Sequence, residues 1–172
     1  MFVVEDTNFL ISLLKSKDIF HMEAISTLEI LSSGDITYIF PSVVLQEAIF
    51  VLLRNGYNAN IIRKRIYEIS MLPKVIIHSI DNLSMLRYSS HYYKRISVSG
   101  DVNTGSITGT NDFNIACVAL DYNALIVSND KRLIKVANTA NIETINFILK
   151  SDREKLKKLL FNPTSYSQKC YP

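Results

Sequence analysis

Short apolar runs alternate along the chain with longer stretches in which apolar residues recur at helical spacing. Each short run has four residues and is rich in β-branched or other apolar side chains, a pattern typical of strands buried on both faces. The runs predict strands at Phe2–Glu5, Thr37–Phe40, Val75–His78, Leu125–Ser128 and Glu143–Asn146. The stretches between them predict helices at Thr7–Ser16, Ile19–Ser33, Ser42–Asn55, Ala59–Met71, Asn82–Ile96, Asn111–Tyr122 and Lys131–Thr139. Strands alternating with helices predict an α/β fold, a three-layer α/β/α sandwich with a central, mostly parallel sheet.

Two segments depart from this alternation. Ser97–Thr110 holds three of the five glycines and few apolar side chains, which predicts a long loop. From about Ser151 the chain reads as a charged helix followed by a polar tail. We therefore expect one folded domain over residues 1–148 and a basic C-terminal helix with a polar tail over residues 149–172.

Composition narrows the class of protein. The chain has 172 residues, 48% of them hydrophobic, which is enough for one domain with its own core. No apolar run approaches the roughly 18 to 20 residues that span a bilayer, and the first residues lack the basic segment of a secretory signal. Two cysteines, Cys117 and Cys170, are too few for a disulfide framework or a cysteine-based zinc site. We expect a cytoplasmic protein with no membrane association.

The net charge of +3 is concentrated in one place. Residues 150–158 carry five basic and two acidic side chains, which leaves 14 of each sign in the rest of the chain. A uniformly basic nucleic-acid binder is therefore not what the composition indicates. Any positive surface must come from local groups of Lys and Arg.

Two acidic residues directly follow predicted strands, and ligands of open parallel sheets bind beyond the carboxyl ends of the strands. Asp6 follows the first strand, and Asp130 follows the fourth. Each is also well placed to cap the helix after it, which is the simpler role for an Asp in this position. Taken singly, neither residue points to a ligand.

Two further acids lie within predicted helices, on stripes that also carry apolar residues. Glu47 lies three residues after Val44 and four before Val51, and Asp112 lies three residues before Ile115. We expect both carboxylates to face inward, where a charge is costly unless it is paired or bound to a metal. Neither stripe carries a Lys or Arg that could pair with them.

The four acids together predict a shared cation site. Mg²⁺ or Mn²⁺ prefers oxygen ligands and is commonly held by carboxylates together with phosphate oxygens. One or two such ions would relieve the mutual repulsion of the carboxylates and could support hydrolysis of a phosphodiester bond. Asn8 and Ser128 are placed to orient the acids.

The motifs stand in an order that resembles the PIN-domain nucleases, and among them the VapC-type toxin ribonucleases of prokaryotic toxin–antitoxin pairs. These motifs are Asp6-Thr7-Asn8, Pro41-Ser42 with Glu47, Asp112-x-x-Ile115-Ala116, and Ser128-Asn129-Asp130. The resemblance implies a metal-dependent endoribonuclease with Asp6, Glu47, Asp112 and Asp130 as its acidic site. It also implies a homodimer and a small antitoxin protein that blocks the site. Many members of the family carry a further acid where this chain has Lys131 and Arg132.

Two alternatives belong to other functional classes. A non-catalytic PIN-like module in RNA processing would bind RNA or protein without cutting, although such modules usually lose some of the acids. A haloacid-dehalogenase-like phosphatase would need a second Asp two residues after the first, where this chain has Asn8.

Aromatic and basic residues are interleaved near the end of the predicted helix Asn82–Ile96. Single-stranded RNA is often held by such mixtures of stacking and charge, so the RNA-binding candidates are Arg87, Tyr92, Lys94 and Arg95. The simpler interpretation is an amphipathic helix whose tyrosines pack inward while its charges face water.

Overall fold

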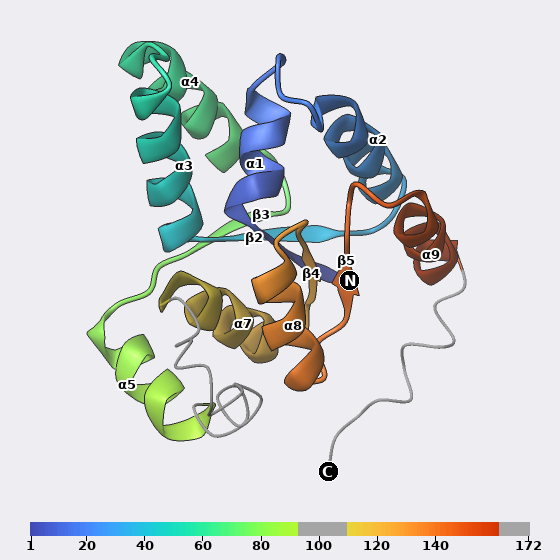
Figure 1. Cartoon of the computed structure of the whole chain (residues 1–172). Helices are drawn as coiled ribbons and strands as arrows, with labels where there is room; N and C mark the ends of the chain where they lie inside the picture. Colours follow the sequence, from blue (N-terminus) through green and yellow to red (C-terminus); the bar gives the residue numbers. More distant parts are fainter. Residues whose placement is uncertain (93–109, 162–172) are drawn as a thin grey trace.

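A computed structural model of the protein describes residues 1–92 and 110–161 and contains a five-stranded sheet covered by helices (Figure 1). All strand pairs in this sheet are parallel. The strands are β1 (Phe2–Glu5), β2 (Thr37–Pro41), β3 (Val75–His78), β4 (Leu125–Val127) and β5 (Thr144–Ile145). The helices are α1 (Thr7–Leu14), α2 (His21–Ser32), α3 (Ser42–Arg54), α4 (Ala59–Ser70), α5 (Asn82–His91), α7 (Thr110–Tyr122), α8 (Lys131–Thr139) and α9 (Lys150–Phe161). The predicted α/β sandwich is confirmed.

The strand order is β3-β2-β1-β4-β5. The chain starts in the middle of the sheet, builds outward through β2 and β3, and then returns to place β4 on the other side of β1. The carboxyl ends of β1 and β4 therefore flank the point where the direction of winding reverses. Crevices for ligands form at this point in open parallel sheets.

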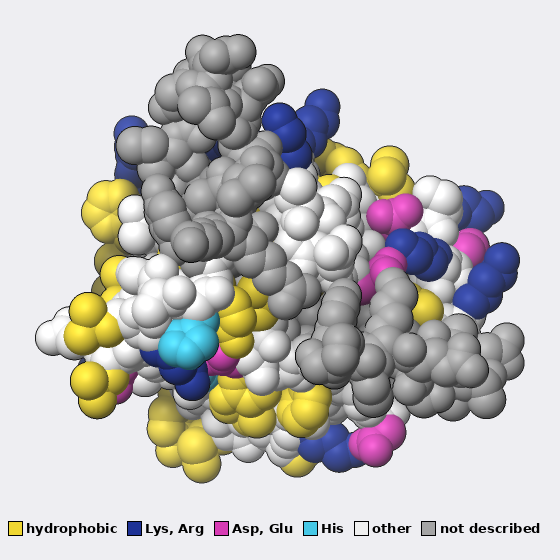
Figure 2. Space-filling view, turned by 90° about the horizontal axis from the view of Figure 1, so that it is seen from below, with side chains coloured by type: hydrophobic (Ala, Val, Ile, Leu, Met, Phe, Trp, Pro, Cys, Tyr) yellow, Lys and Arg dark blue, Asp and Glu magenta, His cyan; other side chains and the backbone are white. Residues whose placement is uncertain are grey.

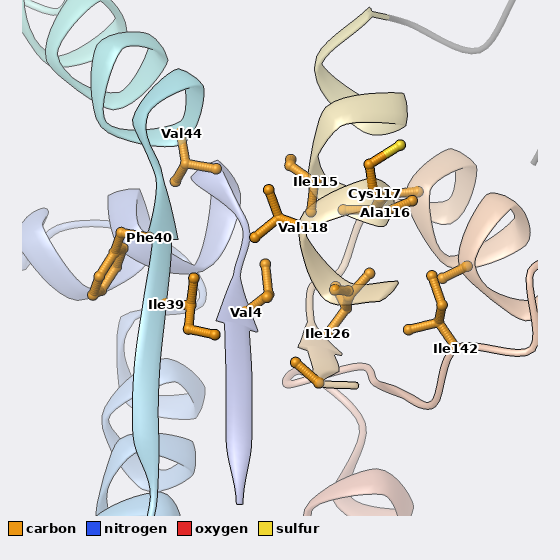
Figure 3. Close-up of a cluster of buried hydrophobic side chains, with 14 of the residues drawn as sticks. Val4, Ile39, Phe40, Val44, Ile115, Ala116, Cys117, Val118, Ile126 and Ile142 are labelled. Atoms are coloured by element: carbon orange, nitrogen blue, oxygen red, sulfur yellow. The ribbon is translucent and has the colours of Figure 1, made fainter. Parts of the chain in front are cut away.

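Side chains alternate along β1 between two hydrophobic clusters, one on each face of the sheet. Val4 packs with Ile39, Ile126 and residues of α7 and α8, and Figure 3 shows Val118 of α7 pointing toward Val4. Val3 belongs to the other cluster, which is built from α1, α2, α9 and the ends of β4 and β5. Because both faces are covered, the strands are mainly apolar on both sides, as the apolar runs predicted.

The turn between α1 and α2 is longer than predicted. The carboxylate of Asp18 accepts hydrogen bonds from the Phe20 N–H, at 3.0 Å, and from the Ser12 hydroxyl, at 3.1 Å. These bonds stabilise a turn, so α1 ends at Leu14 and α2 begins at His21. The sequence predicted a break at residues 17 and 18, and the structure extends it to residues 15–20.

The C-terminal helix packs against the sheet domain. In α9, Leu156 is fully buried in the cluster that contains Val3, and the Arg153 guanidinium donates to the Phe147 carbonyl at 2.6 Å. The division at residues 148 and 149 stays a prediction. Most of the predicted loop Ser97–Thr110 and the polar tail lie outside the described residues. In the described part of the chain, no helix is long and apolar enough to cross a membrane.

Candidate functional site

Asp6 stands at the carboxyl end of β1, where it caps α1 and is 6% exposed. Its Oδ1 accepts the Thr7 N–H at 2.6 Å, and its Oδ2 accepts the Ser128 hydroxyl at 2.6 Å. The Asp6 N–H donates to the carbonyl of Val127 in the neighbouring strand. The carboxylate is therefore held by the first residue of α1 and by Ser128, which directly follows β4.

Ser128 and Asp130 follow the adjacent strand β4. The fully buried Ser128 hydroxyl oxygen accepts the Asp130 N–H at 2.9 Å while it donates to Asp6. Oδ1 of Asp130 caps α8 by accepting the N–H groups of Arg132 and Leu133. Oδ2 of Asp130 has no hydrogen bond to a described residue. Asp130 thus acts as a helix cap and keeps one oxygen available to a ligand.

Asp112 lies in the first turn of α7 and is half-buried. Its Oδ2 is shielded from solvent and has no hydrogen-bond partner among the described residues. A buried carboxylate oxygen without a partner is costly, because folding has removed the water that would solvate it. A ligand that binds such an oxygen would remove this cost.

Glu47 projects from α3 and is exposed, so the inward orientation expected from its apolar stripe is wrong. Val44 on the same stripe is buried, but Glu47 lies at the edge of a pocket, where its side chain is in contact with water. Oε2 of Glu47 accepts the Thr7 hydroxyl at 2.9 Å and the Asn111 amide at 3.1 Å. These two donors hold the carboxylate in place. The sequence pattern did not single out either donor, although each is the chain neighbour of a predicted site acid.

The four acids line one pocket of about 370 Å³ at the carboxyl edge of the sheet. They come from four separate places in the chain, namely the end of β1, helix α3, the start of α7 and the end of β4. The pocket is lined by Asp6, Thr7, Asn8, Glu47, Thr110, Asn111, Asp112, Ile115, Asp130 and Arg132. Asn8 lines the pocket, is exposed and makes no hydrogen bond to a described residue. Arg132 is a basic lining residue that was not predicted as part of the site.

The family model of the PIN domain matches residues 3–139. The chain belongs to the PIN domain family. This match spans the first four strands, β1 to β4, and includes all four acids of the pocket. A search of curated proteins gives no match.

Solved structures similar to this PIN domain come from several bacteria. VapBC2 from Rickettsia felis, bound to a DNA fragment from its promoter, has 20% identity and a TM-score of 0.61, covering 85% of this chain and 98% of that chain. VapBC-1 from nontypeable Haemophilus influenzae has 18% identity and a TM-score of 0.61, covering 87% of this chain and 100% of that chain. FitAcB from Neisseria gonorrhoeae has 20% identity and a TM-score of 0.58, covering 84% of this chain and 97% of that chain. At these identities the likeness establishes the fold.

Burial and mutual repulsion raise the pKa values of two of the acids in the PIN domain. The pKa of Asp6 is raised to about 6, first by burial and then by the charges of Asp130 and Glu47, against the lowering effect of the Ser128 hydroxyl. Burial also raises the pKa of Asp112, with further contributions from Asp130 and Glu47 and opposition from Arg132. The pocket therefore has an excess of negative charge that a bound cation would relieve.

The donor set suits a hard divalent ion. The pocket offers carboxylate oxygens, including the unpartnered Oδ2 of Asp112, and polar side chains without thiols or imidazoles among its lining residues. No group of three or more His, Cys, Asp or Glu side chains in the described ranges is placed to hold a metal ion jointly. Mg²⁺ commonly uses one or two protein carboxylates and keeps several waters, so a three-carboxylate cage is not required.

The predicted RNA-binding side chains Arg87 and Tyr92 are both engaged with α7. Arg87 forms an ion pair with Asp121, and the Tyr92 hydroxyl donates to the same carboxylate at 2.9 Å. Their contacts join α5 to α7, as expected for the amphipathic helix of the simpler interpretation. Lys94 and Arg95 lie outside the described residues. An RNA-binding role for these four residues stays a prediction.

One buried acid, the chain neighbour of Asp6, was not predicted at all. Glu5 ends β1, is 1% exposed, and neither carboxylate oxygen has a hydrogen-bond partner among the described residues. Burial raises its pKa to about 8. Its side chain alternates with that of Asp6 and does not line the pocket. Its burial could have been predicted, because Glu5 belongs to the short apolar run Phe2–Glu5 that predicts a buried strand.

Proposed function

We propose that this PIN domain is a metal-dependent endoribonuclease that hydrolyses RNA phosphodiester bonds with Mg²⁺ or Mn²⁺. The observation that carries the proposal is the convergence of four carboxylates on one pocket, where Oδ2 of Asp112 is buried without a partner among the described residues. Convergence of like charges is unfavourable for folding alone, so it indicates a ligand of opposite charge. Membership of the PIN domain family supports a nuclease.

Asp6 and Asp112 are the proposed principal ligands, and Glu47 and Asp130 complete the site directly or through water. When bound, one or two ions would lower the pKa of a water molecule, making it a nucleophile, and would stabilise the leaving oxygen. Hydrolysis then needs no nucleophilic side chain. In this proposal the acids fix the position of the ion.

The other polar residues of the pocket position these acids. Ser128 holds Asp6 in one orientation and favours its charged form, as its lowering effect on the pKa of Asp6 indicates. Thr7 and Asn111 hold the exposed Glu47 carboxylate at the mouth of the pocket. Arg132 offers a positive charge to a phosphate at a pocket that is otherwise acidic.

We also propose that the protein is the toxin of a toxin–antitoxin pair, acts in the cytoplasm as a homodimer, and is inhibited by a small antitoxin protein. The similar folds of VapBC2, VapBC-1 and FitAcB support this role. Induced expression should arrest bacterial growth, and co-expression of a small protein encoded beside the gene should restore it. Normal growth on expression of active enzyme would contradict the toxin role. Light scattering of the purified protein tests the homodimer.

The nuclease proposal is tested by incubating purified protein with labelled RNA in Mn²⁺, Mg²⁺ or EDTA. We expect cleavage with either ion and none in EDTA. Asp112→Asn should lose more than about 100-fold in rate, because even residues that only orient metal ligands contribute about 10- to 100-fold. The matched control is Asp35→Asn, which changes an exposed acid that is paired with Lys74 and does not line the pocket. An Asp112→Asn variant that is folded and as active as the control would contradict the proposal.

A further inference from the structure

Positive charge on this molecule is local. On the face seen in Figure 2, Lys and Arg side chains stand in separate groups and do not form one basic surface. An RNA strand that reaches the acidic pocket must therefore be held by a particular group of cations near it. The first helical turns of α8 carry such a group.

Lys131, Arg132 and Lys135 lie on α8, which contains no acidic residue, and all three are exposed. Arg132 lines the acidic pocket and acts electrostatically on Asp112. Lys131 and Lys135 form no ion pair with any residue of the described ranges. These two lysines are one helical turn apart and thus lie on the same side of α8.

Both lysines line a second hollow, of about 570 Å³, between α8 and the end of β5. The hollow and the acidic pocket share no lining residue, but both reach the start of α8, where Lys131 lines the hollow and its neighbour Arg132 lines the pocket. Its lining residues are Lys131, Ile134, Lys135, Asn138, Thr139 and Asn146. The two spaces therefore lie on neighbouring sides of the first turn of α8.

Two side-chain amides, of Asn138 and Asn146, add hydrogen-bond donors to this hollow. Oδ1 of Asn138 accepts the Thr144 hydroxyl at 3.2 Å, and Oδ1 of Asn146 accepts the Ile148 N–H at 3.3 Å. Both amide oxygens thus accept a hydrogen bond within the protein, and neither NH₂ group donates to a described residue. With the two ammonium groups, the hollow presents four donor groups, a set suited to phosphate and to base carbonyl oxygens.

Acids near the hollow do not neutralise the lysines. Glu143 is paired with Lys155 of α9, and Oδ2 of Asp152 accepts the Asn146 N–H at 2.8 Å. The positive charge of Lys131 and Lys135 is therefore available to an external anion. The side chain of Ile134 adds an apolar contact in the same hollow.

We propose that the hollow along α8 binds the single-stranded RNA that flanks the cleaved bond, with Lys131 and Lys135 on its phosphates and Arg132 at the junction with the acidic pocket. This inference rests on the proposed endoribonuclease function and adds the path of its substrate. Carboxylates repel an approaching polyanion, so these cations would give the strand its affinity while the pocket supplies the chemistry. Single-stranded RNA fits because its phosphates and its unpaired bases are both accessible to side chains on a protein surface.

The experiment measures binding of a labelled single-stranded RNA by fluorescence anisotropy in EDTA, where cleavage does not occur. The double variant Lys131→Gln/Lys135→Gln should bind about 10-fold or more weakly at about 50 mM salt. Its plot of log affinity against log salt should be shallower by about 1.4, because each contact to a single strand contributes about 0.7. The matched control is Lys17→Gln/Lys64→Gln, which removes the same charge from exposed lysines elsewhere in the chain and should bind as the wild type does.

Equal RNA affinity and equal salt dependence in the wild type and the α8 variant would overturn the inference. It would also be overturned if the α8 variant loses affinity for a labelled polyglutamate peptide while its RNA affinity is unchanged, since the surface would then serve an acidic protein. Failure of the proposed function is separate and is recognised by absence of RNA cleavage by the wild type in Mn²⁺. Circular dichroism of both double variants confirms that any difference does not come from unfolding.

Discussion

Two consecutive acids at the end of β1, Glu5 and Asp6, lie in opposite environments. Asp6 lines the pocket, accepts two short hydrogen bonds and has a pKa raised to about 6. Glu5 lies away from the pocket, has no partner among the described residues and has a pKa raised to about 8 by burial. The hydrogen bonds from Thr7 and Ser128 favour the charged form of Asp6, whereas nothing comparable among the described residues opposes the burial of Glu5. At neutral pH Asp6 is ready to bind a cation and Glu5 is neutral.

Position along the chain therefore does not decide what an acid does. Side chains alternate along a strand, so adjacent residues point to opposite sides. Only Asp6 also meets the N-terminus of a helix, which it caps, and the hydroxyl of Ser128. Glu5 is expected to affect stability, while Asp6 is proposed to affect activity. Substitutions at these residues and at their partners separate the two effects.

The largest effect is expected on RNA cleavage. Asp6→Asn should lose more than about 100-fold in rate, because it removes a proposed ligand. Glu5→Gln should cleave close to the wild-type rate, because this side chain does not line the pocket. Single-turnover cleavage in Mn²⁺ makes the comparison, and comparable losses in both variants would show that the two carboxylates are not functionally distinct.

Ser128→Ala should lower the rate of RNA cleavage about 10- to 100-fold, as expected for a residue that orients a metal ligand. Its hydroxyl lowers the pKa of Asp6, so its removal should also move the acid limb of the pH–rate profile to higher pH. Ser12→Ala is the matched control, since Ser12 is a buried serine that donates to Asp18 outside the pocket. A loss of rate with an unshifted pH profile would contradict the proposed effect on Asp6.

Glu5 should make stability depend on pH. The native state holds its proton more tightly than the unfolded chain, so this contribution is fully present below pH 4.5 and is lost as the pH rises through about 8. Urea unfolding between these limits should show wild-type stability falling relative to Glu5→Gln by at most about 1.4 kcal/mol per pH unit. Parallel stability curves for the two proteins would contradict the burial of a neutral Glu5.

The smallest effect is expected at Thr7. Thr7→Val keeps the shape of the side chain and removes the hydroxyl that donates to Glu47, while the Asn111 amide still holds the carboxylate. We expect a loss in cleavage rate of no more than about 10-fold, at the low end for residues that orient ligands. A loss as large as that of Asp6→Asn would give Thr7 a larger role than its single contact explains.

Much of this molecule could be predicted from its sequence, because the relevant signals are local. The strands were recognisable as short runs such as Leu125–Val127, which are apolar when both faces of a sheet are buried. Asp6 and Asp130 could be placed at one edge because parallel strands end on the same side. The remaining errors concern tertiary contacts. Glu47 has the helical spacing of a buried residue, and only the opening of the pocket beside α3 explains its exposure.

Contacts between distant residues were also beyond the sequence. The donors Thr7 and Asn111 reach Glu47 across 40 and 64 positions of the chain. The donor character of the hollow along α8 depends on which oxygens Asn138 and Asn146 use within the protein. Such pairings follow from the packing of α3, α7 and β5, and no periodicity encodes them.

The central claim is that the pocket acids, and not their buried neighbour, bind a divalent cation. Calorimetric titration of Mn²⁺ into wild-type protein, Asp6→Asn and Glu5→Gln at neutral pH tests it directly. We expect binding of similar affinity to the wild type and Glu5→Gln, and no measurable binding to folded Asp6→Asn. Binding to Asp6→Asn as tight as to the wild type would contradict the claim.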